Sequence, residues 1–449
     1  MTVHWAETIT SARHSSCLLD SDSLPERSWL GKAPDGWSTA RVGDQVRLVN
    51  GHPFDSDLFT LDDGMPLVRI RDLGSLSTEI RYRGEAVAEA IVRRGDILIG
   101  MDGDFVVARW RGDAALLNQR VCCLRPRPSI DGQFLFYALS LPLRIVNDLT
   151  YSTTVKHLSS SQVKALRLPS PPIHVQRAIA DYLDRETERI DALVAKKQRL
   201  IGLLQEKRTA LLSHAVTKGL DSDAPMKDSG IEWFGLIPAH WPVVRLGHFA
   251  HVQNGSTPSR NHAGYWLNGT VPWLASTKVN EDHITSPSEL ITETALRECS
   301  LSLVPTGSVV IGLVGQGRTR GMAALLNIEA TINQNMAAIV PRRRIVGRYL
   351  QYQLESMYIP IRECGRGANQ AALNCELVAD LHLPSPPPAE QVAIARFLDE
   401  RTEAIRALVD KTHRSIDLLG ESRSALITAA VTGQIDVGDV QVRRQAEGL

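Results

Sequence analysis

The stretch from Leu166 to Thr217 reads LRLPSPPIHVQRAIADYLDRETERIDALVAKKQRLIGLLQEKRTALLSHAVT, and it decides the architecture because it occurs twice. Its second copy runs from Leu381 to Thr432 as LHLPSPPPAEQVAIARFLDERTEAIRALVDKTHRSIDLLGESRSALITAAVT. The copies align without a gap, and more than half of their positions are identical. The chain is therefore a tandem duplication, and each copy ends in a predicted long helix.

Apolar residues of the repeat predict that the two long helices pair. Prolines before each helix favour a helix start, and a helix of about 45 residues is on the order of 65 Å long. Such a helix is too long to bury its apolar seam on one compact domain, so we expect the two seams to bury each other. The alternative is that each helix packs on its own globular domain. The predicted seam residues are Leu183, Ile190, Leu193, Ile201, Leu204 and Leu211 in the first helix and Leu398, Ile405, Leu408, Ile416, Leu419 and Leu426 in the second.

The duplication extends upstream of the helices. Residues 29–51 (WLGKAPDGWSTARVGDQVRLVNG) align without gaps on residues 233–255 (WFGLIPAHWPVVRLGHFAHVQNG). Each copy then keeps a short β-like run (94–100 and 306–312), an Asn-Gln before an apolar strand and a helix-like segment, while the rest of the middle diverges. A preserved frame with a changed surface is typical of two recognition modules with different targets.

The sequence thus predicts a mixed α/β fold, with two globular α/β domains separated by a pair of long antiparallel coiled-coil helices. Because the second half repeats the first, each half should be nearly self-sufficient, and a fragment ending near Lys227 should pair with a second copy through its seam. The predicted segments are an N-terminal extension (1–28), a first recognition domain (29–165), a first spacer helix (166–218), a connector (219–232), a second recognition domain (233–380), a second spacer helix (381–436) and a polar tail (437–449).

Composition and motifs restrict the function. The 449 residues carry 50 Lys+Arg and 50 Asp+Glu, a balance that counts mildly against nucleic acid. The six cysteines show neither zinc nor disulfide spacing, and no segment resembles a membrane span or a signal peptide. We expect a cytoplasmic protein without membrane contact. Since phosphate-binding loops, zinc-protease motifs, nucleophile elbows and methyltransferase base-holding motifs are absent from the sequence, we expect no metal site and no catalysis by the chain itself.

Side chains suited to a DNA duplex occur in both diverging middles. Arg fits guanine in the major groove, while Ser, Thr and Lys bind phosphates. Asn118-Gln119 and Asn333-Gln334 occupy the same place in both copies, which favours a role in the shared frame, and the basic run at 342–344 is either a solvated face or a phosphate clamp. The candidate DNA-binding residues are Arg69, Arg71, Arg81, Arg83 and Arg120 in the first domain and Ser256, Thr257, Ser259, Arg260, Lys278, Arg318, Thr319 and Arg320 in the second.

From Trp29 to Asp436 the chain resembles the specificity subunits of type I restriction–modification systems. The most specific motifs are KDSGIEW (227–233) followed by IPAHW (237–241), and PSPPPAEQ (384–391). One departure is that His174-Val175-Gln176 stands where the second copy has the more typical Ala389-Glu390-Gln391, a difference that bears on a modification-subunit contact.

This resemblance implies that each domain reads one half of a split, asymmetric site in double-stranded DNA and that the helices set the gap. It also implies two modification subunits, which use S-adenosylmethionine to methylate adenine, and restriction subunits, which use ATP and Mg. No cofactor is expected in the chain itself. The alternatives are a stand-alone methyltransferase or nuclease, which the missing motifs disfavour, and a scaffold that does not bind DNA, which has no reason to let only the middle of each half diverge.

Overall fold

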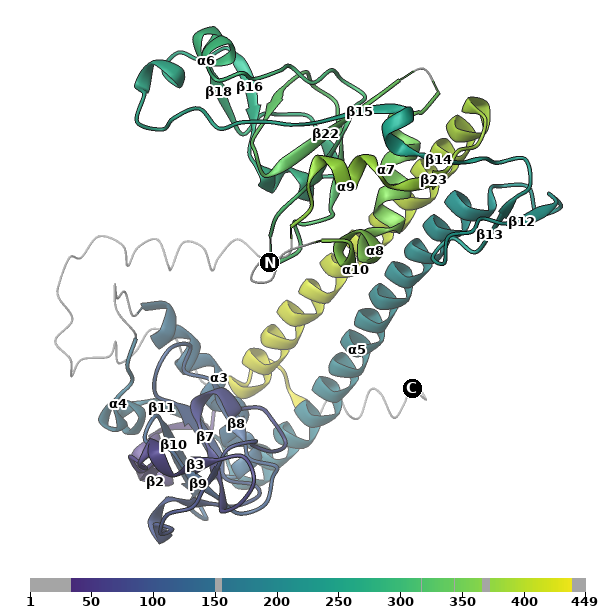
Figure 1. The fold of residues 1–449 in the computed structure, drawn as a ribbon. Coiled ribbons are helices and arrows are strands. Elements are labelled where there is room, and N and C mark those ends of the chain that lie inside the picture. The colour runs from purple at the N-terminus through teal and green to yellow at the C-terminus, as the bar shows by residue number, and fades with distance from the viewer. Residues whose placement is uncertain (1–33, 150–155, 316, 343, 366–371, 438–449) are drawn as a thin grey trace. The chain divides into compact units, whose positions relative to one another are not determined.

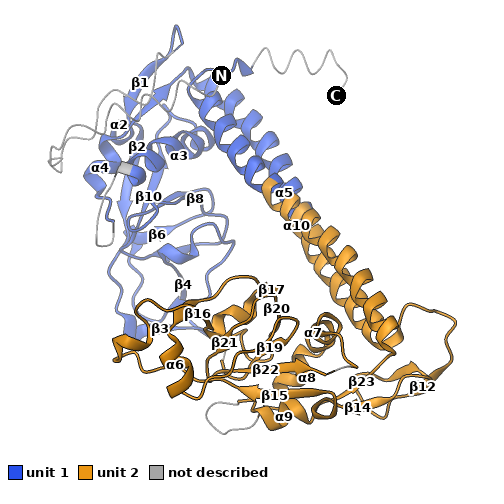
Figure 2. Cartoon of the chain, turned by 90° about the horizontal axis from the view of Figure 1, so that it is seen from above, with its two compact units in different colours: residues 1–196, 415–449 blue, residues 197–414 orange. Residues whose placement is uncertain are grey.

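The long helices divide between two compact units of the structure, a computed structural model that describes residues 34–149, 156–315, 317–342, 344–365 and 372–437. Unit 1 contains residues 1–196 and 415–449, and unit 2 contains residues 197–414 (Figure 2). Each unit therefore holds one recognition domain, the start of that domain's own long helix and the end of the other copy's helix. Each compact unit therefore combines residues from both copies of the sequence repeat.

Unit 1 is built on two small sheets and a two-stranded pair, β1-β11. A four-stranded antiparallel sheet has the order β2-β10-β7-β8, and a five-stranded sheet has the order β3-β5-β4-β9-β6. The strands are β1 (Ser38–Arg41), β2 (Val46–Asn50), β3 (Phe59–Thr60), β4 (Met65–Val68), β5 (Arg81–Tyr82), β6 (Ile91–Val92), β7 (Ile97–Gly100), β8 (Val107–Arg109), β9 (Ala115–Leu117), β10 (Val121–Pro126) and β11 (Arg167–Ser170), and the helices are α2 (Val42–Gln45), α3 (Gly132–Leu149), α4 (Ser160–Ala165) and the start of α5 (Ile173–Lys218).

Unit 2 repeats this plan. Its five-stranded sheet has the order β15-β22-β19-β20-β17, so its first four strands correspond to those of unit 1, and a three-stranded sheet has the order β18-β16-β21. The strands are β12 (Met226–Asp228), β13 (Leu236–Pro238), β14 (Val243–Arg245), β15 (Ala250–Asn254), β16 (Val271–Leu274), β17 (His283–Ile284), β18 (Glu289–Ile291), β19 (Val309–Gly312), β20 (Ala323–Leu326), β21 (Thr331–Ile332), β22 (Met336–Pro341) and β23 (His382–Pro384), and the helices are α6 (Glu293–Glu298), α7 (Gly347–Ser356), α8 (Tyr358–Glu363), α9 (Cys375–Ala379) and the start of α10 (Pro388–Val431).

The core of each unit forms between a sheet and helices from both sequence copies. In unit 1, Phe134 and Leu135 of α3 pack with Leu183 of α5 and with Ile427 and Val431 from the end of α10. In unit 2, the matching core contains Tyr349 and Leu350 of α7, Leu398 of α10, and Leu212 and Val216 from the end of α5. The ends of the long helices thus pack into the domain cores, as one alternative expected. Each core also brings the two helices together, as the other alternative expected.

Within each unit the two long helices run antiparallel (Figure 1). In unit 1, an ion pair of 3.1 Å joins Arg423 Nε of α10 to Asp191 Oδ1 of α5. The predicted mixed α/β fold with antiparallel coiled-coil helices is confirmed. Ten predicted seam residues are buried or partly buried: Leu183, Ile190, Ile416, Leu419 and Leu426 in unit 1, and Ile201, Leu204, Leu211, Leu398 and Ile405 in unit 2.

Two predicted seam residues lie outside the seam. Leu193 and Leu408 are 40% and 49% exposed, whereas the next residues along the chain, Val194 and Val409, are partly buried. A coiled coil needs inward positions at an average spacing of 3.5 residues, which a step of three followed by a step of eight does not maintain. Steps of four and three describe the inward positions of α5 in unit 1: Leu183, Thr187, Ile190 and Val194.

A glutamine near the start of each long helix secures the loop that precedes α3 or α7. Gln176 Oε1 accepts from Asp131 N at 2.8 Å, and its Nε2 donates to Pro171 O at 2.8 Å. Gln391 makes the same contacts with Val346 N and Pro386 O, both at 2.8 Å. Both glutamines are buried, so the repeat preserves the attachment of domain to helix.

The region after α5 is more ordered than the predicted connector (219–232). It forms a hairpin in which Met226 pairs with Pro238, and Phe234 is buried in the core of unit 2. At the start of unit 2's domain, Trp241 Nε1 donates to Glu390 Oε2 at 2.9 Å. The first copy has Val175 in place of Glu390, so the departure noted in the sequence removes this internal hydrogen bond.

Candidate nucleic-acid interface

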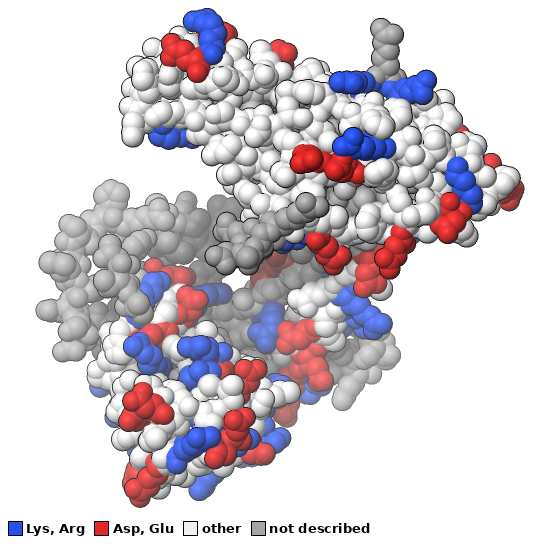
Figure 3. Space-filling model, viewed as in Figure 1, with Lys and Arg blue, Asp and Glu red and all other residues white. Residues whose placement is uncertain are grey.

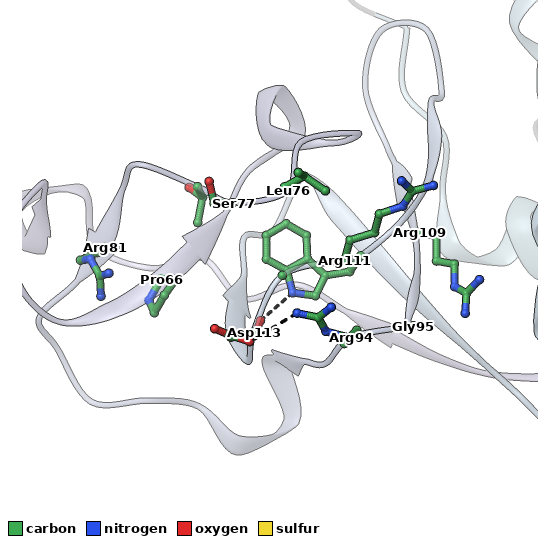
Figure 4. Close-up of a pocket in the computed structure, with 12 residues that line it drawn as sticks. Pro66, Leu76, Ser77, Arg81, Arg94, Gly95, Arg109, Arg111 and Asp113 are labelled. Carbon is green, nitrogen blue, oxygen red and sulfur yellow. Dashed lines mark hydrogen bonds and ion pairs between the residues drawn. The ribbon is translucent and has the colours of Figure 1, made fainter. Parts of the chain in front are cut away.

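A basic cavity of about 680 Å³ lies in the recognition domain of unit 1 (Figure 4). Four arginines line it: Arg81 of β5, Arg94 before β7, Arg109 at the end of β8 and Arg111 after β8. Asp113 is the one carboxylate in the lining. The cavity therefore carries a surplus of positive charge, which suits a polyanion.

Packing beneath the cavity holds its wall in place. The indole of Trp110 is buried, and its Nε1 donates to Asp113 O at 2.7 Å. A Cβ at Gly112 would lie 2.5 Å from that indole, so the turn beside Trp110 requires glycine. Leu76 also lines the cavity and is 68% exposed, which places an apolar side chain among the arginines.

The four arginines differ in whether they already have hydrogen-bond or ion-pair partners within the protein. Arg81 Nη1 donates to Gly64 O at 2.9 Å, Arg94 lies 3.7 Å from Asp113, and Arg109 donates to Gln133 Oε1. Arg111 is exposed, and among the residues that the structure describes it has no hydrogen-bond or ion-pair partner. It is the cavity's most available cation.

Most of the arginines predicted from sequence in the first domain are paired with carboxylates. Arg69 Nε donates to Asp72 Oδ2 at 3.1 Å, and Arg83 and Arg120 form ion pairs with Asp63 and Asp102. Each of these guanidinium groups is therefore already paired within the domain. Of the other two, Arg71 is exposed and Arg81 lines the cavity. The sequence prediction missed Arg94, Arg109 and Arg111. Their signal was one arginine on either side of Trp110 and the upstream pair Arg93-Arg94.

The Asp102 pair has an electrostatic consequence. Burial alone would raise the pKa of the Asp102 carboxyl, but hydrogen bonds from His157 and Arg120 outweigh burial and lower that pKa below its ordinary value. The His157 Nδ1 lies 2.7 Å from Asp102 Oδ1. The carboxylate thus ties the β7–β8 loop to the segment that precedes α4.

In unit 2, the predicted residues before β16 form an aromatic and ionic cluster. Arg260 makes a bidentate ion pair with Glu289, at 2.6 and 2.7 Å, and its guanidinium stacks 3.7 Å from the ring centroid of Trp266. The hydrogen bond from Arg260 lowers the pKa of the Glu289 carboxyl. Lys278 Nζ is likewise paired, with Glu281 at 2.7 Å. These two cations are already neutralised within the domain.

The predicted Ser and Thr residues support the same cluster through their backbone and side chains. Trp273 Nε1 donates to Ser256 O at 3.0 Å, and Trp266 Nε1 donates to Ser259 O at 3.1 Å. The hydroxyl of Thr257 donates to Gln334 Oε1. Ser256, Thr257 and Ser259 therefore shape this surface, whatever they contact outside it.

The glycine-flanked loop between β19 and β20 presents a basic side chain. Its flanks Gly315 and Gly321 have φ of 130° and 82°, a region that favours glycine. Tyr358 OH donates to Arg318 O at 2.8 Å, and Arg362 Nη1 donates to Arg320 O at 2.9 Å. These contacts fix the loop backbone and leave the Arg318 side chain exposed, while Thr319 and Arg320 are partly buried. Gln316 lies outside the described residues.

The Asn-Gln positions belong to the shared frame. A Cβ at Gly51 would lie 2.0 Å from Asn118 O, and one at Gly255 would lie 1.7 Å from Ile332 O. The backbone glycine that follows β2 or β15 therefore lies directly against the segment that contains the Asn-Gln pair, in both units. This repeated close approach supports the interpretation that Asn118 and Asn333 serve the fold.

The basic run after β22 lies beside a second cavity, of about 690 Å³, which is lined by His248, Phe249, Pro341, Arg342 and Arg344. Arg342 and Arg344 are exposed, and Arg343 lies outside the described residues. On the face shown in Figure 3, the recognition domain of unit 1 displays interspersed basic and acidic side chains, whereas that of unit 2 displays few charges.

The described residues offer neither a metal-binding cluster nor a membrane-spanning helix. Those residues hold no group of three or more His, Cys, Asp and Glu side chains that could bind a metal ion. None of the helices in the described ranges combines the length and apolarity that crossing a bilayer requires.

Comparison with known proteins supports this architecture. The chain is 28% identical over 415 residues to the type I restriction enzyme EcoBI specificity subunit of Escherichia coli, covering 89% of this chain and 86% of that protein. It is 22% identical over 432 residues to the MjaVIII specificity subunit of Methanocaldococcus jannaschii, with coverage of 90% and 94%.

Solved structures share the fold. A chain from a study of complex assembly and conformational transition of the type I R-M system gives a TM-score of 0.68 at 21% identity, covering 90% of this chain and 100% of that one. The HsdS subunit from Thermoanaerobacter tengcongensis gives 0.52 at 18% identity, covering 90% and 98%. The Type I restriction modification DNA specificity domain matches residues 34–201 and 238–412, one match for each recognition domain with the start of its long helix. The chain therefore belongs to the family of type I restriction–modification specificity subunits, which are not catalytic by themselves.

Proposed function

We propose that the chain reads a split, asymmetric site in double-stranded DNA, with one half-site for each recognition domain. The observation that carries this proposal is the contrast between a repeated frame and changed surfaces. The order of the four main strands and the contacts of Gln176 and Gln391 repeat. In contrast, unit 1 presents the arginine-lined cavity and unit 2 presents the Arg318 loop.

The basic cavity supports DNA contact by the first domain. Arginine binds phosphate and makes bidentate contacts with guanine. Because Arg111 has no partner among the described residues, it can bind DNA without breaking an internal ion pair. Arg69, Arg83 and Arg120 would each have to leave a carboxylate, so the cavity arginines are the better candidates.

In the second domain, Arg318 takes the corresponding role. Its side chain is exposed on a loop whose backbone is fixed, which reduces the ordering cost of binding. Ser256, Thr257 and Ser259 lie in the same diverged part of the chain and complete the candidate contact region, whereas Arg260 and Lys278 would each have to leave a carboxylate.

The long helices supply docking sites for two modification subunits. Exposed leucines stand beside the seam in both units: Leu193 and Leu418 in unit 1, and Leu200, Leu203 and Leu408 in unit 2. Exposed apolar side chains in this pattern favour a protein partner, and the duplication provides two related surfaces. The modification subunits would bring S-adenosylmethionine for adenine methylation, and the restriction subunits ATP and Mg.

Methylation assays test this function. The chain would be incubated with DNA and S-adenosylmethionine, with and without a cognate modification subunit, and methylated adenines would be mapped by sequencing. We expect no methyl transfer by the chain alone and methylation at one split site by the complex. Methyl transfer by the purified chain would contradict the proposal, and a complex that methylates without sequence preference would favour a scaffold.

A further inference from the structure

Each recognition domain contacts its long helix through the same three side chains. In unit 1, Tyr137 OH of α3 donates to Asp184 Oδ1 of α5 at 2.7 Å and lies 3.0 Å from Thr187 Oγ1. In unit 2, Tyr352 OH of α7 donates to Asp399 Oδ1 of α10 at 2.8 Å and lies 3.3 Å from Thr402 Oγ1. We call these two sets the joints. They have stayed alike while the surrounding domains diverged.

The tyrosines and threonines of both joints are buried. Tyr137 is 3% exposed and Tyr352 is fully buried. Burial, together with the hydrogen bond to Asp184, raises the pKa of Tyr137 to about 12, so the phenol remains a donor at any working pH. A buried donor that loses its acceptor pays the desolvation cost of that group. Each domain is therefore held in one orientation on its helix.

A fourth side chain connects each joint to the β-structure. In unit 1, Gln133 Nε2 donates to Asp184 Oδ1 at 2.5 Å, while its Oε1 accepts from Arg109 of the basic cavity. In unit 2, Arg348 takes the place of Gln133. Its Nε donates to Asp399 Oδ1 and its Nη1 to Asp282 Oδ1, both at 2.7 Å. The chemistry differs, but in both units a continuous polar path runs from β-structure to helix.

We propose that the two joints are positioning sites that set how strictly the chain measures the gap between its half-sites. This inference rests on the proposed function, because it requires a split site. Lengthening the gap by one base pair moves one half-site by about 3.4 Å and rotates it by about 35°. A domain fixed by its joint cannot follow that rotation while keeping the Tyr–Asp hydrogen bond. A wrong gap is therefore penalised even when both half-sites are correct.

The test uses the full chain in complex with its modification subunit. Methylation rates are measured on duplexes with the natural gap and with gaps one base pair shorter and longer. We expect the wild type to prefer the natural gap by tenfold or more, and the double variant Tyr137→Phe, Tyr352→Phe to reduce this preference to about threefold. Base preference within each half-site should not change. The matched control is Glu188→Gln, an exposed position one turn beyond Asp184.

Two results would overturn the inference. An equal loss of activity on all three gaps would show that the joints only stabilise the fold, and an unchanged gap preference would show that they do not measure the gap. If the tyrosine variant does not fold, the pair Thr187→Val, Thr402→Val removes a hydroxyl from each joint and tests the same expectation. A wild-type complex that methylates no split site would instead refute the proposed function.

Discussion

A fragment of residues 1–227 should be an obligate dimer with a new DNA specificity. It contains the first recognition domain and all of α5 but lacks α10. In the full chain, Ile427, Ala430 and Val431 of α10 are at most 5% exposed in the core of unit 1. Their counterparts in the sequence repeat are Leu212, Ala215 and Val216 of α5, which a second fragment can supply.

The magnitude follows from this burial. Full burial of an Ile or Val side chain contributes about 1.5–3 kcal/mol, so the loss of Ile427 and Val431 costs about 3–6 kcal/mol. Since domains are stable by only about 5–15 kcal/mol, the isolated fragment should be marginal as a monomer. Two-fold pairing restores the contact twice. The dimer should therefore fold cooperatively at micromolar concentration, with a Tm that rises with protein concentration.

Light scattering measures the assembly, and sequencing of DNA methylated in the presence of the modification subunit measures its specificity. The expected product is an interrupted palindrome built from the half-site of the first domain. Val216→Asp should abolish dimerisation because it buries a charge, whereas Leu203→Asp, at a side chain that is 51% exposed, should not. A stable monomer, or a dimer that marks the parental asymmetric site, would refute the reasoning.

Other substitutions separate DNA contact from folding. Arg111→Ala should weaken methylation at the first half-site only and Arg318→Ala at the second only, with a loss of about 1–3 kcal/mol at one base pair if the contact is to guanine; equal loss at both half-sites would contradict this assignment. Gln391→Ala removes three hydrogen bonds from a buried position, and calorimetry should show a destabilisation of about 2–4 kcal/mol; a change below about 1 kcal/mol would show that these bonds do not secure the loop before α7. The Asp102 pair contributes stability above the ordinary carboxyl pKa, because the folded-state pKa is lowered. This contribution should fade as the pH falls from the ordinary Asp pKa of about 3.9 toward the lowered folded-state pKa, and Asp102→Asn should remove that part of the pH dependence in urea titrations.

The long helices could be predicted because their signal is periodic and occurs twice. The inward position near the middle of α5 could not be predicted in the same way. Hydrophobicity alone favours Leu193 over Val194, and either residue fits a helix. Only a continuous alternation of four-residue and three-residue steps distinguishes the two residues. Those steps include Thr187, which is polar and is therefore not found when only apolar residues are considered. The polar threonine in the seam is explained by its joint contact with Tyr137.

The prediction that each half is nearly self-sufficient differs from the structure for a related reason. A repeat in sequence shows that the ends of α5 and α10 are equivalent, but equivalence does not say which end covers which domain. In the structure, Ile427 from the second copy lies in the core of the first domain, and Leu212 from the first copy lies in the core of the second. An antiparallel pair of helices requires this exchange, because the end of each helix lies beside the start of the other.

The candidate DNA surface was the least predictable part, because the availability of a cation depends on tertiary pairing. Arg83 and Arg111 look alike in sequence, yet one pairs with Asp63, twenty residues away, and the other has no partner in the described ranges. Arg260 likewise appears free until the fold brings Glu289 and Trp266 to it. An overall balance of 50 cations and 50 anions is therefore compatible with DNA recognition. Carboxylates already hold several of the candidate cations, such as Arg83 and Arg260. Arg111 and Arg318 have no such partner in the described ranges, so they are the better candidates for the specificity of each domain.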